Sequence, residues 1–450
     1  MIKRLVATHH QIKRSPLAHR FLGGAVWSVV GAVVSSGFTL VTMIFIARLL
    51  GKQAYGQFVV IQSTLGMAGV VAGVGVGMTA TRYVADLRVR DSVRLAHILA
   101  LMDRVIFTFG FIASALLIAL SKYIATSALN SANLALPLSI AAFSMFFTAL
   151  DSYNKSILIG LESMRILAIV TIIGTTLGLP IMIIAAKSYG LIGLAVALVI
   201  NSLVQLSISK YQVEKSLKYF AITKQPRGCW DEWPVLRDFA LPSLLSGVFV
   251  PPAHWCCQAM LANKLNGYAE IALLGVAMQW FNVVMFLPNT AGRALLPILT
   301  EHFASGDNRQ AVKLLKLAII SNLVVVVPVA VIITIASPWI MSTYGPQFQD
   351  GSMDLALIVC VAILVVGAAP VGQILAAGER MWLGAAMNFC WAIVYLGSAL
   401  VLSKHGALGI VCSLGIAYVI HSVWVVLYAI SHLTELNSGI NNCAVPGTEI

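Results

Sequence analysis

Charge is scarce in this sequence. Only 10% of the 450 residues are charged and 17 are acidic, whereas 59% are hydrophobic. A soluble globular chain is typically about 25% charged, so this chain lacks the polar surface that a soluble fold needs. The composition therefore indicates an integral membrane protein.

Signals for catalysis, metal binding and disulfide bonding are also missing. The chain contains no H-E-x-x-H, G-x-S-x-G or Walker A sequence and no Asp-rich cluster. Its seven cysteines show neither C-x-x-C spacing nor a grouping with histidine, which is typical of small buried apolar residues. The sequence therefore predicts no enzyme activity, no cofactor and no metal site.

Long apolar runs are what the sequence does contain. A membrane-spanning helix needs about 20 apolar residues, whereas a barrel strand has about 10 in strict alternation. The unbroken runs here predict an all-α integral membrane fold with twelve transmembrane helices. These span 22–47, 55–80, 98–120, 132–151, 165–186, 189–209, 239–261, 270–292, 317–341, 354–376, 381–402 and 406–430.

The basic residues favour one side of this arrangement. With the N-terminus in the cytoplasm, 23 of the 29 Lys and Arg residues fall in inner segments. Cytoplasmic loops collect basic residues, so the asymmetry supports the helix count and predicts that both termini are cytoplasmic. It also accounts for the net charge of +12 without nucleic acid as a partner.

The two halves of the chain are similar at an offset of about 215–217 positions. The clearest match pairs Gly190-x-x-Gly193 with Gly406-x-x-Gly409. Six helices per repeat make the halves parallel, which predicts two pseudo-symmetric six-helix lobes. We therefore expect a cytoplasmic tail 1–21, a first lobe 22–211, a cytoplasmic linker 212–238, a second lobe 239–430 and a cytoplasmic tail 431–450.

Small and polar residues within the predicted helices have two interpretations each. Gly69, Gly73 and Gly77 recur on one face of the second helix, where they permit close helix packing or make a cavity-lining helix flexible. In the seventh and eighth helices, a break at Pro251-Pro252 and polar side chains either line a cavity or hold helices together. These polar residues are His254, Gln258, Gln279, Asn282 and Arg293.

Acidic residues inside the predicted spans are limited to two candidates. An intramembrane carboxylate is the default site for a coupling proton or cation, and Asp103 and Asp151 are the candidates here. Asp103 has the alternative of pairing with a basic neighbour. Asp151 falls at the inner end of the predicted helix 132–151.

One segment resembles a known family. The run Ile46-Ala-Arg-Leu-Leu-Gly-Lys-Gln-Ala-Tyr-Gly-Gln-Phe58 is similar to a signature of Wzx-type oligosaccharide flippases, the polysaccharide-export branch of the multidrug/oligosaccharidyl-lipid/polysaccharide (MOP) superfamily. Segments 77–85, 190–195 and 294–301 are similar to further family segments in the same order. The resemblance covers about residues 20–430.

The resemblance implies a function. Members move undecaprenyl-diphosphate-linked oligosaccharide from the inner to the outer leaflet of the bacterial plasma membrane, for O-antigen, capsule or exopolysaccharide assembly. They are thought to work by alternating access around a cationic cavity lined by helices 1, 2, 7 and 8. Implied partners are this polyprenyl-diphosphate-linked oligosaccharide and membrane lipids, with polysaccharide polymerase and chain-length regulator proteins as further candidates.

This function gives each candidate residue an expected role. Arg82 and Arg293 would contact the diphosphate on the cytoplasmic side, and Arg48 and Lys264 would attract it on the outer side. The polar set of His254, Gln258, Gln279 and Asn282 would face the glycan.

Two alternative functions stay open. A MATE-type cation or drug antiporter needs a carboxylate deep in a lobe, and a membrane polymerase or ligase would be expected to carry a large outer loop.

Overall fold

The computed structural model describes residues 16–73, 75–304, 308–377 and 381–443, and these residues form helices joined by short connections without a strand. The long elements are α2 (Pro16–Gly73), α3 (Val76–Arg90), α4 (Ser92–Tyr123), α5 (Ala135–Gly160), α6 (Met164–Tyr219), α10 (Gly267–Ala304), α11 (Asn308–Tyr344), α12 (Ser352–Ala377), α13 (Met381–Leu402) and α14 (Gly406–Cys443). Shorter α-helices are α7 (Trp233–Val235), α8 (Leu241–Gly247) and α9 (Val250–Ala262). The remaining helical turns are η1 (Ile124–Ala128), η2 (Ala132–Leu134), η3 (Cys229–Glu232), η4 (Leu236–Ala240), η5 (Pro346–Gly351) and η6 (Ser403–His405).

The helices have the length and composition of membrane spans. Eight segments of the described chain are long and apolar enough to cross a bilayer. Three of them, Val26–Gly73, Met164–Tyr219 and Trp382–Tyr428, have 48, 56 and 47 residues, enough for two crossings each at about 20 residues per crossing. The predicted all-α membrane fold is therefore confirmed, and twelve crossings are consistent with these lengths.

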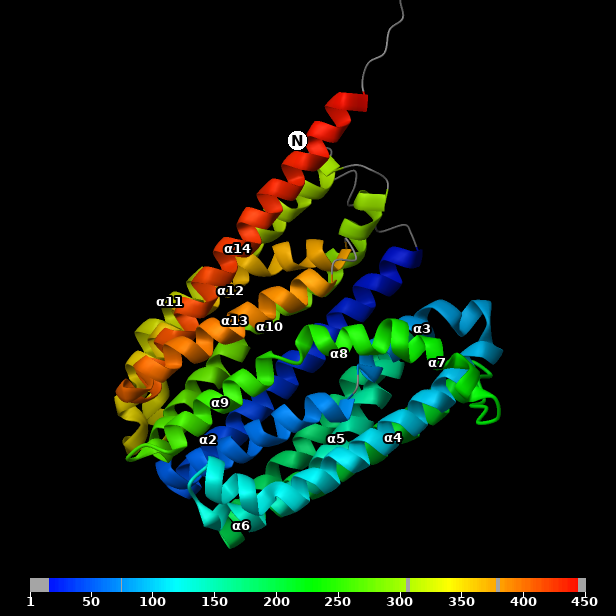
Figure 1. Cartoon of the computed structure of the whole chain (residues 1–450). Coiled ribbons are helices and arrows are strands. Elements are labelled where there is room, and N and C mark those ends of the chain that lie inside the picture. The colour runs from blue at the N-terminus through cyan, green and yellow to red at the C-terminus, as the bar shows by residue number, and fades with distance from the viewer. Residues whose placement is uncertain (1–15, 74, 305–307, 378–380, 444–450) are drawn as a thin grey trace, which may run out of the picture. The chain divides into compact units, whose positions relative to one another are not determined.

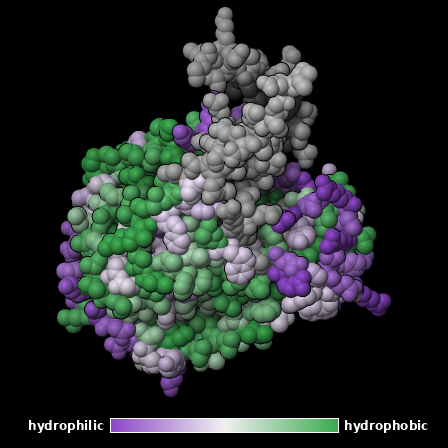
Figure 2. Space-filling model, turned by 45° about the horizontal axis from the view of Figure 1, so that its top comes forward, coloured by the Kyte–Doolittle hydropathy of each residue, from purple (hydrophilic) through white to green (hydrophobic). Residues whose placement is uncertain are grey.

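Large apolar side chains on the helix surfaces face outward. Phe111 on α4 and Ile335 and Trp339 on α11 are 59%, 77% and 71% exposed. Figure 2 shows hydrophobic residues over much of the visible face, with hydrophilic residues gathered toward its margins. Exposed apolar surface of this extent is stable in lipid and not in water.

The chain forms two compact units. Unit 1 comprises Met1–Leu49, Thr64–Ser127 and Ser131–Leu244, and unit 2 comprises Leu50–Ser63, Ala128–Asn130 and Leu245–Ile450. In unit 1, α5 packs between α4 and α6, which run alongside it (Figure 1). In unit 2, α12 packs against α10, α11 and α14.

The internal repeat is visible in the backbone. Gly190 has φ 54° and ψ −131°, and Gly406, the matching position 216 residues later, has φ 67° and ψ −142°. Gly193 and Gly409 each lie against a backbone carbonyl of their own unit, where a Cβ would come within 2.2 Å of Ala185 O and 1.8 Å of Leu402 O. The same backbone geometry at both matched pairs supports the predicted pseudo-symmetric duplication.

The glycine-rich second helix differs from its prediction. It is not one helix over 55–80, because α2 ends at Gly73 and α3 begins at Val76, after Gly75 with φ 64°. A Cβ at Gly73 would meet no described atom within 4 Å, whereas one at Gly77 would lie 3.0 Å from Ser156 Oγ. Regular spacing along the chain suggested one packed face, but the backbone break at Gly75 separates these glycines.

The break in the seventh helix is confirmed. The segment consists of α8, which ends at Gly247, and α9, in which Pro251 and Pro252 occupy the first turn. Proline is favoured in a first turn because the backbone N–H there has no helical partner. The predicted helix 239–261 is therefore two helices.

The cysteines are only partly as expected. Six of the seven lie among residues whose side chains are described, and all six are free thiols. Cys229 and Cys257 are buried, but Cys360 is exposed on α12. Burial, which the sequence predicted for the cysteines, therefore holds for two of these six.

Candidate functional site

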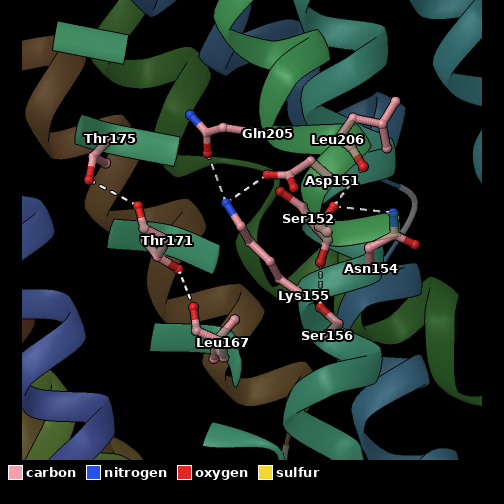
Figure 3. A network of polar contacts seen from close by, with 11 residues as sticks. Asp151, Ser152, Asn154, Lys155, Ser156, Leu167, Thr171, Thr175, Gln205 and Leu206 are labelled. Atoms are coloured by element: carbon pink, nitrogen blue, oxygen red, sulfur yellow. Dashed lines mark hydrogen bonds and ion pairs between the residues drawn. The ribbon is translucent and has the colours of Figure 1, made fainter. Parts of the chain in front are cut away.

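The strongest candidate site is a group of polar side chains within unit 1, between α5 and α6. Figure 3 shows the Lys155 side chain reaching toward Asp151 and Gln205. The Lys155 ammonium donates to Asp151 Oδ2 at 2.7 Å and to Gln205 Oε1 at 3.0 Å. One turn away, Asn154 Nδ2 donates to Ser209 Oγ at 3.3 Å. We call these five residues the α5–α6 network.

Helical spacing explains why these side chains meet. Asp151 and Lys155 are four residues apart on α5 and share a face. On α6, Asn201, Gln205 and Ser209 follow each other at the same interval and form a polar stripe. The network therefore joins polar side chains of α5 to two members of this stripe on α6.

Two glycines on the N-terminal half of α6 make room for the stripe. A Cβ at Gly174 would lie 2.8 Å from Gln205 Cγ, and a Cβ at Gly178 would lie 2.6 Å from Asn201 Oδ1. Because α6 reverses at Gly190, its two halves pack together, and only glycine at these positions leaves space for the amide side chains. The stripe therefore depends on close packing within one helical hairpin.

Asp151 is deeply placed. It is 5% exposed and lies nine residues before the end of α5, which is about 14 Å along the helix. Its Oδ1 atom is buried and has no hydrogen-bond donor among the described residues. The position differs from the predicted helix end at 151, because the charges of Asp151 and Lys155 neutralise each other and α5 continues to Gly160.

The other coupling candidate has a different setting. Asp103 on α4 accepts from Lys224 Nζ at 2.8 and 2.7 Å, and the two side chains are 41% and 29% exposed. Nearby, Arg94 donates to Glu232 at 2.9 and 3.1 Å. These pairs bind the segment after α6 to α4, and the Asp103 carboxylate is neither deeply buried nor unpaired.

The predicted polar residues of unit 2 fall into two groups. Gln258 is buried on α9, where its Oε1 accepts from Ser63 Oγ at 2.6 Å. On α10, Gln279 Oε1 accepts from the Tyr344 hydroxyl at 3.2 Å, while Asn282 is exposed. Two of the three amide side chains, those of Gln258 and Gln279, thus have hydrogen-bond partners within the protein.

His254 lies against aromatic rings. Its ring centroid is 5.6 Å from that of Trp391 and 5.3 Å from that of Tyr395, and both partners on α13 are almost fully buried. Such edge and tilted contacts stabilise an aromatic cluster. The side chain contributes to the interior of unit 2, which the sequence did not predict.

The predicted basic residues are spread over the described chain. Arg82 on α3 lies with its guanidinium 4.5 Å from the centre of the Phe239 ring, a cation–π contact. Arg48 is exposed on α2, and Lys264 is exposed in the turn before α10. The side chain of Arg293 lies outside the described residues.

Sequence reasoning missed four of the five residues of the α5–α6 network. Lys155 was counted with the basic residues of the inner face, and Asn154, Gln205 and Ser209 were not considered. The spacing of Lys155 from Asp151 was the available signal, since an acid and a base four apart in an apolar helix pair with each other. Nothing in the sequence indicated Gln205, which lies 50 residues away.

Metal-ligating side chains are not grouped in the described part of the chain. No group of three or more His, Cys, Asp or Glu side chains among those residues could hold a metal ion. What the α5–α6 network offers is an ammonium group with uncharged amide and hydroxyl neighbours beside a carboxylate. Such a set can bind an anion or a proton.

The chain is similar in sequence to proteins of polysaccharide biosynthesis and export. The family model described as "Polysaccharide biosynthesis protein" matches residues 21–303. The chain is 23% identical over 398 residues to the EPS I polysaccharide export inner membrane protein EpsE of Ralstonia solanacearum, covering 87% of this chain and 89% of that protein. It is likewise 23% identical over 406 residues to the EpsE protein of Ralstonia nicotianae, with coverage of 88% and 91%.

Solved structures share the fold at low sequence identity. A multidrug resistance MATE family transporter of the MOP superfamily, in an inward-facing conformation, matches with a TM-score of 0.74 and 14% identity over 91% of this chain and 99% of that chain. A MOP superfamily transporter from Pyrococcus furiosus matches with a TM-score of 0.72 and 15% identity over 95% and 98%. These likenesses establish the fold.

Proposed function

The chain belongs to the polysaccharide biosynthesis protein family, and we propose that it is a flippase for polyprenyl-diphosphate-linked oligosaccharide. In this proposal it moves the lipid-linked glycan from the inner to the outer leaflet of a bacterial inner membrane by alternating access, with both termini in the cytoplasm. The product serves O-antigen, capsule or exopolysaccharide assembly. The observation that carries the proposal is the family match over residues 21–303.

The Lys155 ammonium in the α5–α6 network supports an anionic substrate. A diphosphate binds best to ammonium or guanidinium groups in a protected place, and Lys155 is such a group with a side chain 22% exposed. The network also contains amide groups, which hydrogen-bond phosphate oxygens without adding charge. The relatives named as polysaccharide export proteins are consistent with a lipid-linked glycan.

The remaining predicted residues keep their proposed roles. Arg48, Arg82, Lys264 and Arg293 are proposed contacts for the diphosphate at the two ends of the path. Of the glycan contacts, Asn282 is supported by its exposed side chain, whereas Gln258 and Gln279 would have to exchange their present partners for sugar hydroxyls. The buried aromatic setting of His254 gives no support to a glycan contact.

A second candidate function is cation or drug antiport. It is favoured by the fold shared with the multidrug resistance MATE transporter. A cationic substrate needs a carboxylate without a cation, however, and the deep carboxylate of Asp151 already pairs with Lys155. The observed pairing therefore leaves Asp151 without the free carboxylate that a cationic substrate needs.

Deletion of the gene tests the proposal in cells. We expect lipid-linked oligosaccharide to accumulate on the cytoplasmic leaflet and surface polysaccharide to be lost, with both restored by the wild-type gene. The strain must lack a second flippase, and leaflet position is measured by labelling the glycan in intact and lysed spheroplasts. Normal surface polysaccharide, together with drug sensitivity that overexpression reverses, would favour the antiporter and overturn the flippase.

A further inference from the structure

The ammonium group of Lys155 is only partly satisfied by the protein. It has three N–H donors and, among the described residues, two acceptors, which are Asp151 Oδ2 at 2.7 Å and Gln205 Oε1 at 3.0 Å. Its side chain is 22% exposed, whereas that of Asp151 is 7% exposed. One donor and one face of the ammonium are therefore open to a ligand that arrives from outside the network.

Asp151 has the opposite deficiency. Its Oδ1 atom is buried and receives no hydrogen bond from any described group, so half of the carboxylate is uncompensated. A buried carboxylate in a helix within the membrane is costly unless it is paired with a cation or protonated. Asp151 therefore depends on Lys155 for as long as it stays ionised.

The groups around this ion pair carry no charge. From α6, Gln205 and Ser209 contact the network, and α3 contributes Thr81, whose hydroxyl donates to the Ser156 carbonyl at 3.1 Å. The charged groups on α4 and on the segment after α6 that lie near α5 are Asp103 and Lys224, and these pair with each other. On α3, which also packs against α5, the Arg82 guanidinium lies over the Phe239 ring and Arg88 pairs with Glu162.

An incoming anion and Asp151 therefore share the charge of one ammonium. If a phosphate oxygen binds to the open donor of Lys155, the carboxylate is less fully compensated, and its open Oδ1 atom is the place where a proton can add. The proton comes from the aqueous solution and no covalent bond of the ligand changes. The network is then occupied by Lys155, a phosphate group and a neutral acid.

We propose that Lys155 binds phosphate and that Asp151 forms an ion pair with it in the ligand-free protein. Binding of a diphosphate ester to Lys155 is then accompanied by uptake of one proton on Asp151. This inference rests on the proposed function, which supplies the diphosphate ester as the substrate class. It adds the residue that binds the phosphate and a proton that accompanies it.

Binding of a short polyprenyl diphosphate to the purified full-length protein tests the proposal. The probe is farnesyl diphosphate, with farnesol as the uncharged control, and the measurement is isothermal titration calorimetry in two buffers that differ in ionisation enthalpy. We expect wild-type protein to take up protons on binding. Asp151→Asn should bind the probe about tenfold more tightly and lose that uptake, because the amide does not compete for the ammonium.

Three further variants separate the proposed role from a purely structural one. Lys155→Arg keeps the cation and should retain binding, whereas the charge-free pair Asp151→Asn with Lys155→Met should lose at least about tenfold in affinity without an unpaired buried charge. Asp238→Asn is the matched control, because it makes the same substitution at an exposed pair with Arg237. It should bind like the wild type.

Two results would overturn the proposal, and they are distinguishable. If wild-type protein binds farnesyl diphosphate no better than farnesol, the substrate class fails and this inference fails with it. If wild-type protein prefers the diphosphate but Asp151→Asn shows unchanged affinity and unchanged proton uptake, the proposed function stands and the role of the ion pair is wrong.

Discussion

Replacing Lys155 by methionine is expected to lower the free energy of unfolding by about 3–5 kcal/mol, because it leaves the buried Asp151 carboxylate without a cation. Asp151 is 5% exposed and its second oxygen has no donor among the described residues, so no nearby group can compensate. The loss should be read from unfolding of the purified protein in a denaturant titration. Transport is expected to fall with it.

The double variant separates charge from packing. Asp151→Asn combined with Lys155→Met removes both charges and should recover most of the lost stability, since replacing a buried ion pair as a whole is often nearly neutral. Arg237→Met is the control, because its pair with Asp238 is exposed and exposed ion pairs contribute little to stability. A double variant as unstable as Lys155→Met alone would show that the lysine acts through packing and not through charge.

Alanine at Gly406 is expected to destabilise unit 2 more than alanine at Gly190 destabilises unit 1. Both glycines have positive φ values, so any side chain costs about 1–3 kcal/mol in backbone strain. At Gly406 a Cβ would also lie 2.2 Å from Glu270 Oε2, which accepts from the Ala407 N–H at 2.7 Å. The expected loss at Gly406 is therefore larger by about 1–3 kcal/mol.

Comparison of the alanine variants at Gly190 and Gly406 separates backbone strain from side-chain overlap. A Cβ at Gly190 would meet no described atom within 4 Å, so Gly190→Ala reports backbone strain alone. Thermal unfolding of both single variants in the same detergent measures the difference. Equal losses at the two positions would mean that the contact with Glu270 contributes nothing to the stability of the α14 start.

The fold was largely predictable because lipid imposes simple rules on sequence. Long apolar runs specify helices, and the repeated Gly-x-x-Gly pairs indicated a duplication that the similar backbone angles of Gly190 and Gly406 support. Helix ends were less predictable. The break at Gly75 depends on its backbone conformation, and the extension of α5 to Gly160 depends on mutual neutralisation of two charges.

The candidate site was less predictable than the fold. Asp151 was identified because an intramembrane acid is rare, but Lys155 looked like another basic residue of the inner face. Gln205 could not be placed beside them, since its position follows from the packing of α6 on α5. Pairing across helices depends on three-dimensional contact, which hydropathy along the chain does not encode.

The central claim concerns transbilayer movement of a lipid-linked glycan, and reconstitution tests it most directly. The purified protein is incorporated into liposomes that carry polyprenyl-diphosphate-linked oligosaccharide in both leaflets, and a membrane-impermeant glycosidase is added outside. With the protein present, we expect the glycan of the inner leaflet to become accessible as well. If the glycosidase cleaves only the glycan of the outer leaflet, as in protein-free liposomes, the result would contradict the account.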